Sequence, residues 1–358
     1  MSRLNDFLRG IRVVDVSFYI PGPMASLQLA DMGAEVTKVE PPWGDDMRAL
    51  GPRDADGRPL FYEALNAGKT VTRLDFKQEA GRIALLELAD HADIFIEGFR
   101  PGVMARLGLG TEALRARNPR LITCSISGYG AAGPLAQQAG HDGNYLAGAG
   151  MLHRNGVPPR FFDPPIADLS GSLFAVIAIL GALHARAADG RGCHIDLGLA
   201  DVAMPLQLFE IAGFGATGQV PQPNATYLNG GAAYYQIYPV AEGRHVMLGA
   251  VETKFWQEFC QAAGHPEWIA RHAEPLPQHA LIADVAACFK TLTLDDCDTR
   301  FTRECCVSTV LDLAEAVASP HHAERGLVTR SGGGLQSLFP AWIDGAPPQV
   351  RKPLTERQ

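Results

Sequence analysis

Short apolar runs alternate with stretches of helical spacing along roughly the first third of the chain. The runs are rich in β-branched residues, as expected of strands that are buried on both faces. The expected strands are 10–16, 35–40, 71–75, 94–97 and 121–126, and the helices between them include 24–32 and 77–90. Strand–helix–strand units of this length have right-handed crossovers and build parallel sheets. The pattern therefore predicts an α/β fold around a parallel sheet.

The pattern changes after about residue 200, which predicts a second and smaller domain. Residues 214–231 are rich in Gly, Pro and Asn and are typical of a linker. β-like runs and amphipathic helices follow between 234 and 318. We predict a large α/β domain at 1–200, completed by 330–358, and a segment at 201–329 that contains linkers and a small α+β domain.

Composition and charge narrow the classes of protein. The chain has 358 residues, is 47% hydrophobic and carries a net charge of -8, which argues against a broad nucleic-acid binder but not against an anionic small molecule. Seven cysteines without CxxC spacing suggest neither a zinc site nor a disulfide framework, so we expect a reducing compartment, the cytoplasm. No signal-peptide run is visible at the N-terminus, and the apolar run 173–183 fits a buried helix better than a membrane span.

A histidine with an adjacent carboxylate follows the expected strand at 121–126. His141 and Asp142 lie between Gly140 and Gly143. Histidine has an unperturbed pKa of roughly 6.5, so it can accept and return protons near neutral pH. The residues by themselves are equally typical of a polar loop with an exposed histidine. His141 is therefore a candidate for proton transfer.

A second carboxylate, Asp168, precedes the apolar run and is expected to cap the helix that the run forms. Such an aspartate usually satisfies backbone donors and does nothing else. A helix N-terminus also offers amide hydrogens and positive potential, which would stabilise an enolate oxygen. Asp168 is thus a second candidate, for which simple capping is the alternative.

Basic residues on loops and strand ends of the first domain suggest a local entrance for an anion: Lys38, Arg48, Lys69, Arg73 and Arg100. The turn at Asn66–Lys69, with its central glycine, could hold a phosphate. The first strand–helix turn lacks GxGxxG, which gives little support to a dinucleotide site. Each of these cations could equally be an ordinary surface charge.

Several longer sequence motifs occur in order along nearly the whole chain. They are GIRVVDVSFYIPGPMASLQLADMGAEVTKVE (10–40), NAGKTVTRLDFK (66–77), FRPGVMARLGLG (99–110), SISGYGAAGPLAQQAGHDGNY (125–145), ADLSGS (167–172) and GAVETKFW (249–256). They resemble the family III CoA-transferases, or CaiB/BaiF superfamily. The GHDxNY and GAVExxFW segments resemble the α-methylacyl-CoA racemase branch. The resemblance implies a Rossmann-like large domain and an acyl-CoA substrate.

Specific roles are also implied by this resemblance. His141 would be one base, Asp168 the opposing acid and base, and Glu252 the partner that tunes the histidine. Arg100 would shape the site beside the CoA chain, and the segments around Lys38 and Asn66–Lys69 would contact the nucleotide. The implied reaction epimerises the α-carbon of 2-methylacyl-CoA thioesters by two-base 1,1-proton transfer through an enolate. It needs no metal and no separate cofactor, because CoA is part of the substrate.

Two other functions stay open. One is a family III CoA-transferase that moves CoA between organic acids through an aspartyl-CoA intermediate on Asp168. The other is a non-catalytic CoA-binding protein.

The resemblance further implies an interlocked homodimer, in which the two chains pass through each other.

Overall fold

The computed structural model describes residues 3–331 and 334–357. The chain divides into two compact units. The first takes its described residues from 1–149, 162–207 and 319–358, and the second from 150–161 and 208–318. The first unit ends at residue 207, later than the predicted boundary at 200, and it resumes at residue 319, earlier than the predicted 330. Residues 150–161, which the sequence pattern left in the first domain, belong to the second unit.

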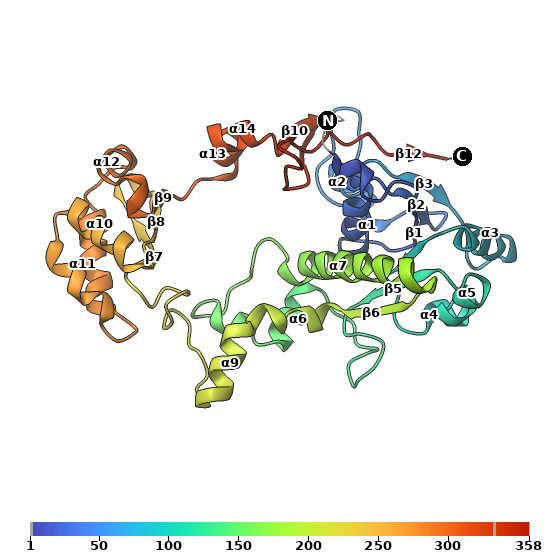
Figure 1. Ribbon diagram of the computed structural model, residues 1–358, viewed down its shortest axis with the longest axis horizontal. Helices are drawn as coiled ribbons and strands as arrows, with labels where there is room; N and C mark the ends of the chain where they lie inside the picture. The colour runs from blue at the N-terminus through green and yellow to red at the C-terminus, as the bar shows by residue number, and fades with distance from the viewer. Residues whose placement is uncertain (1–2, 332–333, 358) are drawn as a thin grey trace. The chain divides into compact units, whose positions relative to one another are not determined.

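A seven-stranded parallel sheet forms the centre of the first unit (Figure 1). Its strands are β1 (Arg12–Asp15), β2 (Glu35–Glu40), β3 (Thr70–Arg73), β4 (Ile94–Glu97), β5 (Ile122–Ser127), β6 (His194–Gly198) and β12 (Thr355–Glu356). The order β12-β3-β2-β1-β4-β5-β6 contains the doubly wound order 3-2-1-4-5-6. The chain runs outward in opposite directions from β1, which puts the topological switch point between β1 and β4. The predicted parallel α/β architecture is confirmed.

Helices cover both faces of this sheet (Figure 1). The helices of this unit are α1 (Pro21–Asp31), α2 (Leu60–Asn66), α3 (Glu79–Asp90), α4 (Val103–Arg106), α5 (Thr111–Arg117), α6 (Asp142–Gly148), α7 (Ile166–Asp189), α8 (Leu199–Val202) and α14 (Pro320–Arg325). Short 3-10 turns lie at η1 (Arg3–Asp6), η2 (Asp46–Ala49) and η4 (Pro205–Gln207), and β10 (Val328–Ser331) pairs with β11 (Gly334–Ser337). α1 begins at two prolines, which favour the first turn of a helix, and packs against α7.

The sheet is buried on both faces because its strands are apolar at consecutive positions. Val14 and Phe95 pack with Leu85 of α3 and Leu114 of α5 in one core cluster. The neighbouring residue Val13 is also buried, and successive side chains of a strand point to opposite faces. Continuous apolar runs in the sequence were therefore the correct signal for a sheet between two helical layers.

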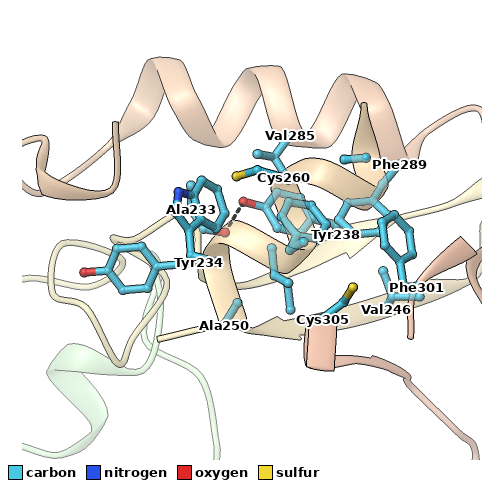
Figure 2. Packing of buried hydrophobic residues seen from close by; sticks show 14 of the residues in the cluster. Ala233, Tyr234, Tyr238, Val246, Ala250, Cys260, Val285, Phe289, Phe301 and Cys305 are labelled. Atoms are coloured by element: carbon cyan, nitrogen blue, oxygen red, sulfur yellow. Dashed lines mark hydrogen bonds between the residues drawn. The ribbon is translucent and has the colours of Figure 1, made fainter. Parts of the chain in front are cut away.

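The second unit is built on a three-stranded antiparallel sheet in the order β7-β8-β9. Its strands are β7 (Tyr235–Pro239), β8 (His245–Gly249) and β9 (Val307–Thr309). Its helices are α9 (Leu208–Thr217), α10 (Thr253–Ala263), α11 (His279–Phe289), α12 (Leu294–Arg300) and α13 (Leu313–Ala318). Short 3-10 segments lie at η3 (Leu152–Arg154), η5 (Ala241–Gly243), η6 (Pro266–Ala273) and η7 (Arg303–Cys305). Figure 2 shows its aromatic core, in which the Tyr238 hydroxyl donates to the carbonyl of Ala233 at 2.7 Å and Phe289 stacks on Tyr238. This unit has its own hydrophobic core, as the predicted smaller α+β domain requires.

Two helical segments, Ile166–Asp189 and Leu199–Thr217, are long and apolar enough to span a membrane by length and composition. The core helix of a globular protein can have the same length and composition. α7, the first of them, packs against α1, β5 and β6. It ends at Gly190, whose φ of 73° is the left-handed conformation that favours glycine at a helix end.

Candidate active site

A cleft of about 450 Å³ opens at the carboxyl ends of β1, β4 and β5. It lies beside the switch point of the sheet, where ligands of doubly wound proteins bind. Its walls come from the segments after these strands and from the starts of α1, α6 and α7: Ser17, Phe18, Tyr19, Pro21, Gly22, Gly98, Phe99, Arg100, Pro101, Ile126, Ser127, Gly128, Ala136, Gln138, Ala139, Gly140, His141, Asn144, Tyr145, Asp168 and Leu199. The structure thus brings three predicted residues, His141, Asp168 and Arg100, to one cavity.

His141 is the residue immediately before α6 and holds the start of that helix. Its backbone N–H donates to Oδ1 of Asn144 at 3.0 Å, and the Asn144 N–H donates back to the His141 carbonyl at 2.8 Å. This reciprocal pair fixes the backbone on which the imidazole is carried. The imidazole itself is exposed and meets the ring of Tyr19 edge-on, with centroids 6.3 Å apart. An accessible imidazole on a fixed backbone suits proton transfer with a bound ligand.

Asp168 lies inside the first turn of α7 and does not cap it, contrary to the prediction. The capping position belongs to Pro165, whose side chain cannot accept a hydrogen bond. Asp168 is partly buried, and burial together with the nearby charge of Asp142 raises its pKa to about 7. A carboxyl group with this pKa exchanges protons near neutral pH in both directions.

The cap of α7 is supplied from another helix. Oδ1 of Asp142 accepts hydrogen bonds from the amides of Ala167 at 2.7 Å and Asp168 at 3.2 Å. The amides at this helix start were expected to stabilise an enolate oxygen. Two of them, those of Ala167 and Asp168, already donate to Asp142 and are not open to a ligand.

The loop between β1 and α1 forms one wall of the cleft and is held by buried charges. Tyr19 has a φ of 61°, a conformation that residues other than glycine rarely adopt and that collects at functional sites. Behind this loop the carboxylate of Asp15 accepts hydrogen bonds from the N–H and hydroxyl groups of Ser17 and from the hydroxyl of Ser26. Burial would raise the pKa of Asp15, but Lys38 and Lys69 hold it below the ordinary value.

Three residues expected to contact a nucleotide support this loop instead. Lys38 is fully buried, donates to the carbonyl of Ser17 at 2.7 Å and pairs with Asp45 at 3.0 Å. Lys69 is also fully buried and donates to the carbonyl of Pro23 and to Oδ1 of Asn66, which is itself buried. The side chains of all three residues are therefore bonded within the protein.

The remaining predicted cations differ in their surroundings. Arg48 pairs with Glu40 at 2.9 Å and with Glu356 of β12 at 2.9 Å, and Arg73 approaches the same Glu356 at 3.9 Å. These two arginines therefore join the C-terminal strand to the sheet. Arg100 is exposed at the cleft, and among the described residues it lies within 4.0 Å of no carboxylate.

Glu252 is in the second unit, at the residue before α10, and is exposed. Its predicted partnership with His141 stays a prediction.

Several cleft residues were missed by sequence reasoning. Tyr145 donates its hydroxyl to the carbonyl of Gly140 at 2.6 Å, and burial, with the nearby Asp168, raises the pKa of this tyrosine to about 12. Tyr145 follows His141 by four residues, which is one helical turn, so the helical period could have found it. Tyr19 carried no comparable signal, because a positive φ at a tyrosine cannot be read from residue type.

A second hollow of about 390 Å³ lies at the carboxyl ends of β1 to β4. It is more apolar than the cleft and shares Ser17, Phe18 and Phe99 with it. Trp43 and Phe76 contribute to its walls, and exposed cations stand at Lys77 and Arg106. The ammonium group of Lys77 lies 5.7 Å from the ring centroid of Trp43.

Comparison with known proteins gives matches over almost the full length. The model of CoA-transferase family III matches residues 8–354. The acetyl-CoA:oxalate CoA-transferase of Acetobacter aceti is 32% identical over 351 residues, which are 94% of this chain and 89% of that protein. The alpha-methylacyl-CoA racemase of Mus musculus is 33% identical over 356 residues, which are 96% of this chain and 88% of that protein.

Among solved structures, a CAIB/BAIF family protein from Brucella suis superimposes with a TM-score of 0.84 at 29% identity, covering 97% of this chain and 95% of that one. Relatives at about the same identity thus include both transferases and racemases. Because the family model spans nearly all of the sequence and the fold agrees, this chain belongs to CoA-transferase family III.

Proposed function

We propose that the protein is an α-methylacyl-CoA racemase-like enzyme that inverts the α-carbon of 2-methylacyl-CoA thioesters. The observation that carries the proposal is the presence, in one cleft, of an accessible imidazole and a carboxyl group with a pKa of about 7. Inversion needs one group to remove the α-proton and a second group to return a proton to the other face. His141 and Asp168 are two such groups, and both line the same cleft.

In the proposed reaction the deprotonated member of the pair takes the α-proton and leaves an enolate. The protonated member then gives its proton to the opposite face of the same carbon. In the reverse direction the two roles exchange, so both groups must accept and donate protons. The partial burial of Asp168 supports this, because it keeps a substantial fraction of the carboxyl protonated near pH 7.

The nucleotide end of CoA is proposed to occupy the second hollow. The exposed ring of Trp43 offers a surface on which a base can stack, and Lys77 and Arg106 offer charge to phosphates. Arg100 follows Phe99, which lines both the cleft and the second hollow. We propose that Arg100 contacts the CoA chain between the two sites. These residues replace Lys38, Asn66 and Lys69 in that role.

A CoA-transferase is the second candidate, because relatives of this chain carry that name and because Asp168 could act as its nucleophile. A nucleophilic carboxylate must be ionised, and the raised pKa of Asp168 reduces the ionised fraction at neutral pH. The acid form, which is present beside the ionised form near pH 7, suits proton transfer in both directions, and His141 in the same cleft supplies the second group that proton transfer needs.

One experiment separates the candidates. The full chain is incubated in heavy water with one enantiomer of a 2-methylacyl-CoA, and separately with the acyl-CoA and a free organic acid. Deuterium at the α-carbon together with loss of optical purity is the expected result. Transfer of CoA to the acid without α-exchange would establish the transferase instead, and neither product would indicate a non-catalytic CoA-binding protein.

We also propose that the chain forms the interlocked homodimer that its family resemblance implies, and that it acts in the cytoplasm. Support for association comes from α7, where Leu173 and Ile177, one turn apart, are 47% and 62% exposed. Light scattering is expected to give twice the chain mass of 38.4 kDa. Ile177→Asp should lower that mass toward the monomer, whereas Ala188→Asp, at the exposed last turn of the same helix, should not. A monomeric wild type would contradict the proposal.

A further inference from the structure

We propose that Asp142 is a positioning residue that fixes Asp168 relative to His141 and acts electrostatically on the Asp168 carboxyl group. This inference rests on the proposed proton-transfer function of His141 and Asp168. It concerns a residue that does not line the cleft and that acts through its neighbour.

The first argument is geometric. Asp142 is the first residue of α6, directly after His141, and its Oδ1 accepts the amides of Ala167 and Asp168 at the start of α7. The path from the histidine to the aspartate is thus one peptide bond, one side chain and one hydrogen bond. Although His141 and Asp168 are distant in sequence, their backbones are tied together by this single carboxylate.

The second argument is that α7 has no cap of its own. The first amides of a helix need acceptors, and a side chain at the preceding position normally provides one. Here that position is Pro165, which has no acceptor. Asp142 supplies the missing acceptor from another element, and its negative charge also suits the positive end of the α7 dipole.

The third argument is electrostatic. The titratable groups around Asp168 are Asp142 and Tyr145 from α6 and His141 before it, while Arg100 lines the same cleft. Burial is the larger cause of the raised pKa of Asp168, and Asp142 adds to it because a second negative charge opposes ionisation. A cap with a neutral oxygen could accept the same two amide hydrogen bonds without this effect.

The test compares Asp142→Asn, which keeps the accepting oxygen and removes the charge, with Asp142→Ala, which removes both. The control is Asp189→Asn, a charge change at the exposed far end of α7. The readout is the titration of the Asp168 carboxyl by ¹³C NMR of the full chain labelled at aspartate carboxyls, with Asp168→Asn to assign its signal. The steady-state kcat and KM for racemisation are measured in parallel.

We expect the Asp168 midpoint to fall in Asp142→Asn and to stay unchanged in Asp189→Asn. A fall of one pH unit would lower the protonated fraction at pH 7 from about one half to about one tenth, so kcat at pH 7 should fall about fivefold, with KM unchanged, in the direction in which Asp168 donates a proton. In Asp142→Ala, lost alignment should lower kcat by about 10². If Asp142→Ala does not fold, the Asp142→Asn titration decides alone.

An Asp168 midpoint that stays at its wild-type value in Asp142→Asn would overturn the inference. Because the titration needs no catalytic activity, it also separates the two proposals. Absence of α-proton exchange in the wild type would refute the proposed function, whereas a shifted Asp168 midpoint would still support the electrostatic action of Asp142.

Discussion

Asp168→Asn is expected to lower the racemisation rate by about 10² to 10⁴, the range for loss of one proton-transfer group. The amide of asparagine matches the carboxyl group in shape but cannot exchange a proton in the working range. Because Asp168 is partly buried and its backbone amide is held by Asp142, the substitution leaves the fold of the α7 start intact. Racemisation is measured by the optical rotation of a 2-methylacyl-CoA with time.

CoA affinity provides the check that the loss is chemical. Calorimetric titration with free CoA should give the same affinity for Asp168→Asn and wild type, because Asp168 does not line the hollow proposed for the nucleotide. Asp189→Asn is the matched control and should racemise at the wild-type rate. Unchanged racemisation in Asp168→Asn would remove Asp168 from the mechanism.

The racemisation rate of the wild type, measured in each direction as a function of pH, should also report the protonation of Asp168. The pKa of Asp168 is raised to about 7, so its acid form is present below pH 7 and is lost as the pH rises through this value. The direction in which Asp168 must donate a proton should therefore slow above pH 7. The direction in which it must accept one should slow below pH 7.

Lys69→Met is expected to destabilise the first unit by about 3 to 5 kcal/mol, because it breaks a buried ion pair and leaves Lys38 as the one remaining lysine that offsets the Asp15 charge. Lys69 and Asp15 are both fully buried, with Nζ 3.6 Å from Oδ2. Methionine fills similar space but leaves the carbonyl of Pro23 and Oδ1 of Asn66 with one donor fewer. Hydrogen exchange of amides in β1 to β3 measures the loss, as a fall in protection of about 10² to 10⁴.

Two further variants identify the cause. Lys352→Met removes an exposed lysine of the same unit and should change protection by less than about 0.5 kcal/mol. Asp15→Asn combined with Lys69→Met removes both charges and should cost less than Lys69→Met alone. Equal protection in Lys69→Met and Lys352→Met would show that the pair contributes nothing to stability.

Much of the architecture was predictable from local pattern. Strands such as β1 and β4 are apolar at consecutive positions because helices cover both faces of the sheet, and this leaves a signal in a few adjacent residues. The helix end at Gly190 was predictable for a similar reason, since a left-handed residue favours glycine. His141 and Asp168 were also identified as candidates, through motif order rather than through local chemistry.

Local pattern was misleading where a charge found a distant partner. Lys38 and Lys69 resemble surface cations in the sequence, yet they are fully buried because Asp45 and Asp15 neutralise them. Burial of a lysine depends on an acceptor brought close by the fold, and residue type does not report it. The side chains of Lys38 and Lys69 therefore do not form the basic entrance for an anion that was predicted from the sequence, because both are buried in ion pairs.

The sequence alone determined the parallel sheet, the presence of a second domain and the pair of candidate acid–base residues, because each follows from periodicity or from ordered motifs. Only the tertiary structure decided how that pair is held. The role of Asp142 depends on a contact with Ala167 and Asp168 across 25 and 26 positions, and on the absence of a cap at Pro165. A hydrogen bond between distant segments is set by how α6 and α7 pack, which no local pattern records.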